Sequence, residues 1–179
     1  NTGGVNVWFF KPLTVPNNLQ TIISEGNNYI KITIAEEINF NVNMIVEIST
    51  KLELSAETAW RTVKKSSTLV FITKGLLGFS QENFPPEWKE GETVKTRLFL
   101  FNFIPAWKHE ICFVRIDDNQ FELYTNEKGG MVSVWNHLIK IDPVNEQVCL
   151  YTDKIEIEAG VLTPIVGFFA RIFYRFRQR

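Results

Sequence analysis

The chain contains 179 residues, of which 45% are hydrophobic and 22% charged, and its 19 basic and 20 acidic residues leave a formal net charge of -1. This is long enough for one domain, or one domain with an extension, and too hydrophobic for a disordered chain. The balanced charge argues against a dedicated nucleic-acid binder, because phosphate-backbone affinity needs a clustered excess of Lys and Arg. The 15 Phe and 5 Trp must pack either in a dense core or around a cavity.

Cysteine usage and the chain start bear on the compartment. Cys112 and Cys149 are expected to be free thiols in a reducing compartment, with one disulfide as the alternative. The N-terminus Asn1-Thr2-Gly3-Gly4 lacks the basic and apolar regions of a signal peptide. The apolar stretches fall far short of the roughly 20 residues that span a bilayer. We therefore expect a cytoplasmic protein.

The first half of the chain is expected to hold strands followed by helices. Residues 1–28 show little pattern, while Tyr29–Ile34 and Ile38–Leu54 alternate apolar and polar residues, which predicts strands. The second of these is one long strand, or two separated by a bend. Ser55 is a good N-cap for a helix that runs to Val63, and a second short helix is expected over Ser67–Leu77.

The second half is expected to hold a run of antiparallel strands and then a long helix. Turn residues separate five apolar segments, which predicts strands over Thr93–Ile104, Trp107–Ile116, Gln120–Asn126, Met131–Ile141 and Gln147–Glu158. Thr163-Pro164 opens a helix over Leu162–Arg179 whose apolar residues recur at helical spacing. The expected class is α+β, with this helix buried on a strongly curved sheet.

Four segments in this order resemble the START-like, birch-pollen-allergen-like helix-grip superfamily, also called SRPBCC. They are Leu54–Trp60, Trp135-Asn136-His137, Tyr151-Thr152-Asp153 and Gly160–Thr163. The resemblance covers 44–179 and implies a ligand-binding domain there, with a curved sheet around the C-terminal helix and two short helices after the first strand. Residues 1–43 have no counterpart and are expected to form an arm and an added strand. Because this scaffold hosts binders, carriers and enzymes, the resemblance alone implies no single activity.

Strand register predicts a buried pair of ionisable groups. If the hairpin around Asp142–Glu146 pairs residues whose numbers sum to 290, His137 lies opposite Asp153 and Trp135 opposite Ile155 on one inward face. In an apolar pocket an imidazole and a carboxylate could act as general acid and base. The alternative, which we favour, is a structural hydrogen bond that satisfies two buried polar groups.

Other side chains are candidates to line the pocket. His109 either lines it from another strand or lies exposed at the strand start beside Lys108 and Glu110, and we favour the exposed position. Phe99, Phe101 and Phe103 predict a strand that is covered on both faces. The residues expected to contact a ligand are Trp135, His137, Tyr151, Asp153, Phe169, Phe173 and, from its alternative position, His109. Plain core packing is the alternative for the aromatic side chains.

The end of the last helix is rich in arginine. Arg171, Arg175 and Arg177 alternate with aromatic residues, which predicts either transient contact with an anionic membrane surface or a solvated face that complements the helix dipole. We favour the solvated face. The expected oligomeric state is a monomer or a homodimer.

We expect the domain to bind or transport a small hydrophobic ligand, such as a lipid, isoprenoid or polyketide-like molecule. One alternative is a polyketide cyclase or aromatase-type enzyme that uses His137 and Asp153. A second is an interaction module with a filled core. An enzyme is the less favoured class, and neither a metal nor a cofactor is expected, because two histidines without a dense His/Cys/Asp cluster do not indicate zinc and no dinucleotide motif occurs.

Overall fold

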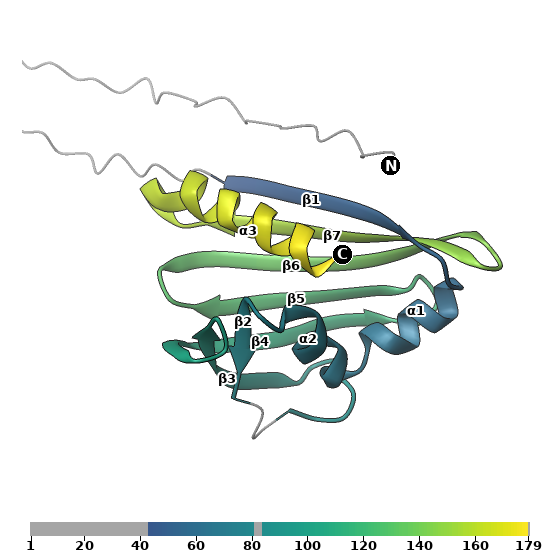
Figure 1. The fold of residues 1–179 in the computed structure, drawn as a ribbon, viewed down its shortest axis with the longest axis horizontal. Coiled ribbons are helices and arrows are strands. Elements are labelled where there is room, and N and C mark those ends of the chain that lie inside the picture. The colour runs from purple at the N-terminus through teal and green to yellow at the C-terminus, as the bar shows by residue number, and fades with distance from the viewer. Residues whose placement is uncertain (1–42, 81–83, 179) are drawn as a thin grey trace, which may run out of the picture.

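The computed structural model describes residues 43–80 and 84–178. In this part of the chain seven strands form one antiparallel sheet in the order β1-β7-β6-β5-β4-β3-β2 (Figure 1). The strands are β1 (Asn43–Leu52), β2 (Leu77–Phe79), β3 (Thr93–Leu100), β4 (Ile104–Asp117), β5 (Glu122–Gly129), β6 (Val132–Asn145) and β7 (Val148–Glu158). The five strands expected after residue 92 are confirmed, with shifted ends, and the short β2 was not expected.

Helices cover one face of the sheet. They are α1 (Ala56–Val63), α2 (Ser66–Thr73) and α3 (Thr163–Arg177), the last preceded by the 3-10 turn η1 (Gly160–Leu162). Ser55 caps α1 as expected, since its hydroxyl accepts a hydrogen bond from the Thr58 amide at 3.3 Å. α3 packs on β1 and β7 (Figure 1), where Gly167 and Ala170 are buried and allow close approach. The expected α+β arrangement with a long C-terminal helix is confirmed.

The buried side chains form two separate clusters. One lies under α1 and contains Trp60, Trp88 and Phe113, with the Trp88 and Phe113 rings stacked 4.7 Å apart. The other joins α3 to β1 and β7 and contains Phe173 and Tyr174. The aromatic residues therefore build two dense clusters and leave space between them. No helix in 43–80 or 84–178 is long and apolar enough to cross a membrane.

The strand expected over Thr93–Ile104 ends early. β3 stops at Leu100, and Phe101 and Asn102 turn the chain with φ of 52° and 69°. Phe103 follows in the same turn and is 73% exposed. The expectation that Phe101 and Phe103 lie in a strand covered on both faces is wrong, because the left-handed backbone at two successive residues breaks the alternation.

The register of the β6–β7 hairpin differs by two residues from the prediction. His137 lies opposite Ile155, and Asp153 lies opposite Ile139. The strand was expected to end at Ile141, before Asp142-Pro143, but β6 continues to Asn145 and the hairpin turns at Glu146-Gln147. On the edge of β6 that faces β5, the Ile141 amide donates a hydrogen bond to the Phe121 carbonyl, which precedes the first residue of β5. Pro143 thus sits where β5 offers no further partner, so its missing N–H costs no hydrogen bond.

Some expectations fall outside the described residues. The strand over Tyr29–Ile34, the first part of the Ile38–Leu54 strand and the N-terminal arm lie in residues 1–42. Cys112 and Cys149 are both free, as expected.

Candidate functional site

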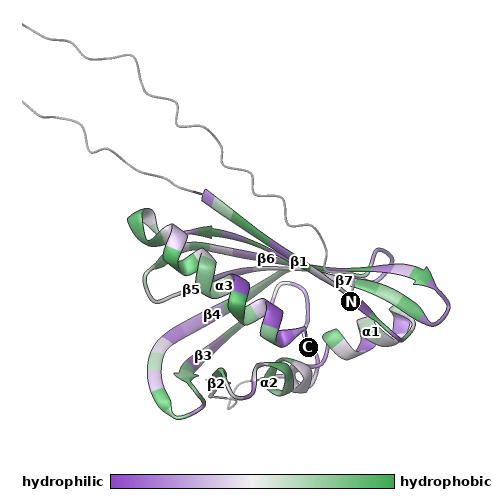
Figure 2. Ribbon diagram, turned by 45° about the horizontal axis from the view of Figure 1, so that its top comes forward, coloured by the Kyte–Doolittle hydropathy of each residue, from purple (hydrophilic) through white to green (hydrophobic). Residues whose placement is uncertain are grey.

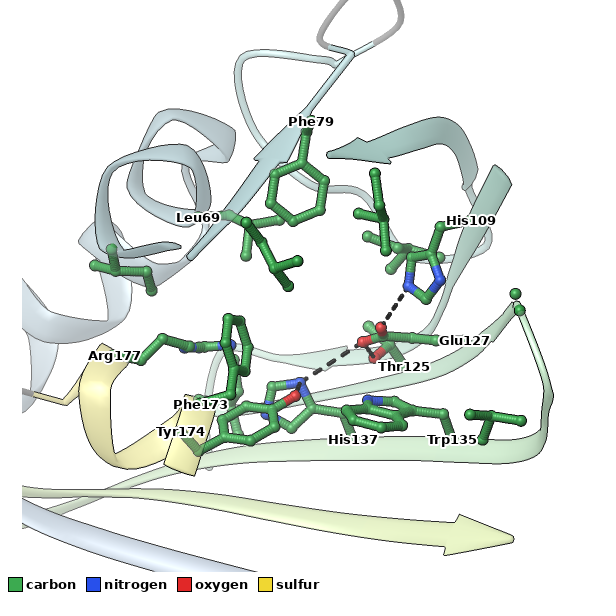
Figure 3. A pocket seen from close by; sticks show the side chains of 18 of the residues that line it. Leu69, Phe79, His109, Thr125, Glu127, Trp135, His137, Phe173, Tyr174 and Arg177 are labelled. Carbon is green, nitrogen blue, oxygen red and sulfur yellow. Dashed lines mark hydrogen bonds and ion pairs between the residues drawn. The ribbon is translucent and has the colours of Figure 1, made fainter. Parts of the chain in front are cut away.

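A cavity of about 470 Å³ lies between the sheet and the helices α2 and α3. Leu69 of α2 and Phe79 of β2 face Phe173 of α3 across it, and the middle strands of the sheet form its floor (Figure 3). Most of its lining is apolar: Ile72, Leu98, Ile111, Leu123, Ile139 and Val166 are further examples. Its size and lining are typical of small-molecule sites in proteins.

Four ionisable side chains, one from each of four neighbouring strands, form a row of which the first three line the floor of the cavity. This polar row consists of His109 on β4, Glu127 on β5, His137 on β6 and Asp153 on β7. His109 Nε2 lies 2.8 Å from Glu127 Oε2, His137 Nδ1 lies 3.7 Å from Glu127 Oε1, and His137 Nε2 lies 2.7 Å from Asp153 Oδ1. Figure 3 shows Glu127 between the two imidazoles. The pairs are diagonal neighbours in the ladders, two residues away from direct opposition.

The surroundings of Glu127 and His137 favour the ionised forms of these two side chains. Burial raises the pKa of Glu127, but hydrogen bonds from His109 and His137 outweigh it and hold that pKa far below its usual range. Burial lowers the pKa of His137, but its bonds to Asp153 and Glu127 outweigh this and raise it above 6.5. These contacts therefore stabilise the imidazolium form of His137 between the carboxylates of Glu127 and Asp153.

Arg177 supplies the opposite charge at the Asp153 end. Its Nη2 lies 3.4 Å from Asp153 Oδ1 and donates to the Tyr151 hydroxyl at 3.0 Å. Tyr151 in turn donates to Asp153 Oδ1, and the Gln178 amide donates to Oδ2. Burial raises the pKa of Asp153, but the Arg177 charge and the His137 hydrogen bond outweigh it and lower it. This cluster fastens the C-terminal end of α3 to β7.

The structure corrects two expectations about charged residues. The preferred, exposed position of His109 is wrong: its side chain is only 12% exposed and lines the cavity. Gly129 makes room for it, since a Cβ there would lie 2.8 Å from His109 Nδ1. Arg177 does not belong to a solvated or membrane-facing surface, because its side chain is 5% exposed and paired with Asp153.

Most of the predicted site residues come together around the cavity. Its lining includes Trp135, His137, Tyr151, Phe169, Phe173 and His109. Asp153 is not among the lining residues; it is fully buried behind them. The parity argument placed these side chains on one face correctly, even though the register was wrong by two, because a two-residue slip keeps each side chain on its face.

Glu127, Arg177 and Tyr174 were missed. Glu127 follows Leu123 and Thr125 in the alternation, so it faces inward as they do. The predicted strand ended at Asn126, which placed Glu127 in a turn. A strand extended to Gly129 would have found it. Arg177 and Tyr174 had no comparable signal, because arginine near a helix end is usually solvated.

Metal binding has no support in the part of the chain that the structure describes. No three His, Cys, Asp or Glu side chains in residues 43–80 and 84–178 are grouped so that they could hold a metal ion.

The chain matches no protein-family model and no curated protein. It is similar to solved structures of norcoclaurine synthase from Thalictrum flavum (13% identity, TM-score 0.55, 88% of this chain and 96% of that one) and of a START superfamily protein from Mycobacterium smegmatis (14%, 0.55, 74% and 90%). It is also similar to the ginseng major latex-like protein 151 from Panax ginseng (15%, 0.52, 76% and 95%). At these identities the likeness shows the fold. The chain has the helix-grip fold, as the sequence resemblance implied.

Proposed function

We propose that this helix-grip domain binds a small, mainly apolar molecule that carries one polar group. The observation that carries the proposal is the apolar cavity of about 470 Å³ whose floor holds one row of buried ionisable side chains. The lipid, isoprenoid and polyketide-like classes expected from the sequence include many molecules that combine an apolar body with a few oxygen atoms. A carrier or sensor needs no further chemistry.

The apolar body of the ligand would lie between Leu69, Phe79 and Phe173, which face one another across the cavity (Figure 3). Burying such a body removes apolar surface from water on both partners, at roughly 25 cal/mol per Å². The lining residues come from α2, from α3 and from strands β2 to β7 of the sheet. The cavity therefore depends on the complete fold.

The polar group of the ligand would meet the His109 and Glu127 end of the row. Both side chains line the cavity, and His109 Nδ1 is buried without a hydrogen-bond partner among the described residues. A ligand atom that bonds to Nδ1 would relieve the cost of that unmade hydrogen bond. Asp153 has both oxygens bonded by protein groups, so we assign it to holding α3 rather than to ligand contact.

Filling the cavity tests the proposal. We expect Leu69→Trp to abolish binding of an apolar fluorescent probe such as anilinonaphthalene sulfonate, because the larger ring takes the space of the ligand. Val144→Trp is the matched control, since Val144 is 52% exposed on the β6–β7 hairpin. Native mass spectrometry of the unaltered protein should show a bound molecule that Leu69→Trp loses. Equal probe binding by both variants and the unaltered protein would refute the proposal.

A second candidate, an enzyme that moves a proton, is favoured by one observation. Glu127 lines the cavity and is held between two imidazoles, so its carboxylate could take a proton from a ligand. This extends the expected acid–base use of the His137 and Asp153 pair to Glu127. Once a bound molecule is identified, incubation in deuterium oxide should exchange one of its C–H hydrogens, and Glu127→Gln should stop the exchange while leaving binding intact. Absence of exchange in the unaltered protein would end the enzyme hypothesis.

A further inference from the structure

Three connections that are far apart in the chain lie at one end of the sheet. Antiparallel pairing brings the end of β3, the start of β4, the end of β5, the start of β6 and the end of β7 together, as the pairs Leu100–Ile104, Gly129–Val132 and Val134–Glu158 show. In Figure 1 the β3–β4 and β5–β6 connections and the start of α3 all lie at the left. The β4–β5 and β6–β7 turns lie at the opposite end.

These three connections carry no charge. Asp, Glu, Lys and Arg are absent from residues 98–107, 129–139 and 159–170. Each connection instead exposes large apolar side chains, which we call the apolar tip: Phe101, Phe103, Met131, Val161 and Ile165. Phe103 is 73% exposed and Met131 78% exposed. Loops at a water-facing surface are usually polar. Five exposed apolar side chains at one end therefore indicate that this end contacts something less polar than water.

The opposite end of the sheet provides an internal comparison. Its connections are Asp118-Asn119-Gln120-Phe121 and Glu146-Gln147, and apart from Phe121, which packs against the core, this is the composition expected of turns in water. Both ends are built by the same antiparallel strands. The apolar tip is therefore a property of one end and not of the hairpins in general.

Positive charges border the apolar tip. Three cations lie beside it, namely Arg97 at the end of β3, Lys108 at the start of β4 and Lys128 at the end of β5, together with one acidic residue, Glu158. Arg97 and Lys108 are direct cross-strand partners, and both are exposed. Like charges directly opposite each other destabilise a sheet, whereas an anion between them would reverse that effect. Apolar side chains bordered by cations are complementary to the acyl and headgroup layers of an anionic bilayer.

We propose that the apolar tip inserts into the surface of an anionic lipid bilayer, with Arg97 and Lys108 against the headgroups. The contact differs from the one expected at the arginine-rich end of α3, where Arg177 is turned inward. Trp107, Met131 and Ile165 also line the cavity, so the cavity reaches this end of the molecule. A ligand could then pass between the bilayer and the cavity without crossing water.

Vesicle flotation of the full chain tests this surface. We expect the protein to float with vesicles of phosphatidylcholine and phosphatidylserine, and far less with phosphatidylcholine alone. Phe103→Ser with Met131→Ser should weaken the partitioning at least about tenfold, because two large apolar groups no longer leave water. Arg97→Gln with Lys108→Gln should remove the preference for phosphatidylserine and its sensitivity to salt. Val144→Ser, an exposed apolar position at the opposite end, should change nothing.

The other outcomes overturn the proposal. It is wrong if the unaltered protein floats with neither vesicle, or if the tip variants float as well as Val144→Ser does. Light scattering without lipid identifies another occupant: a dimer that Phe103→Ser converts to a monomer would assign the tip to a second copy of the chain. Circular dichroism should show every variant folded, since the substituted side chains are exposed. The vesicle test needs no bound ligand, so it stands or falls separately from the proposed function.

Discussion

Removing the Asp153 carboxylate should strongly destabilise the fold, because it leaves the buried Arg177 guanidinium without its counter-charge and His137 without one of its hydrogen-bond acceptors. Asp153 is fully buried and the Arg177 side chain is only 5% exposed. In Asp153→Ala the Arg177 guanidinium keeps its bond to Tyr151 but loses its counter-charge, and His137 loses the acceptor at 2.7 Å. Breaking one side of a buried ion pair costs about 3–5 kcal/mol. That is a large part of the 5–15 kcal/mol typical of a domain.

Arg177→Met should cost less than Asp153→Ala. The Asp153 carboxylate would still accept hydrogen bonds from His137, Tyr151 and Gln178, so we expect about 1–3 kcal/mol. The double variant should be more stable than the sum of the two losses predicts, by at least about 1 kcal/mol, because neither charge is then left alone.

Urea unfolding followed by tryptophan fluorescence measures these differences, since the chain contains five Trp. Lys154→Met is the control: Lys154 neighbours Asp153 in β7, but its side chain is 47% exposed and its ion pair with Glu47 is at the surface, so its loss should cost under about 1 kcal/mol. Additive losses in the double variant, or a cost for Asp153→Ala no larger than that of Lys154→Met, would refute the account of this cluster.

Three further predictions concern stability. The pKa of His137 is raised above 6.5 in the folded state, so its stabilisation should be complete below that pH and lost as the pH rises through the folded-state pKa; His137→Gln should remove this part of the pH dependence of urea unfolding. Ser55→Ala should lower the free energy of unfolding by about 1 kcal/mol through loss of the α1 cap, while Ser55→Gly should lower it by only a few tenths. Gly129→Ala should lower the melting temperature, because its Cβ would lie 2.7 Å from the Lys108 carbonyl and 2.8 Å from His109 Nδ1; an unchanged melting temperature would contradict this packing.

Local patterns in the sequence were enough to predict most elements of the fold. Side chains on one face recur every two residues in a strand and about every 3.6 residues in a helix. Both patterns can be recognised from neighbouring residues in the sequence. They predicted β1, the strands β3 to β7 and α3, and Ser55 marked the start of α1. Parity also placed Trp135, His137 and Tyr151 on one inward face. The resemblance to helix-grip proteins then implied the order of the layers, which the solved structures confirm.

Tertiary structure alone decided which of these side chains meet. Parity is unchanged by a slip of two residues, so it could not distinguish Asp153 opposite His137 from the observed diagonal contact. Predicting Glu127 as a site residue required knowing where β5 ends. That end is set by pairing with β4 and β6 rather than by composition. Arg177 turned inward because Asp153, 24 residues away in the chain, offers a buried counter-charge. The residues next to Arg177 in the sequence do not indicate that Asp153 is its partner, whereas the folded sheet brings Asp153 within hydrogen-bond distance.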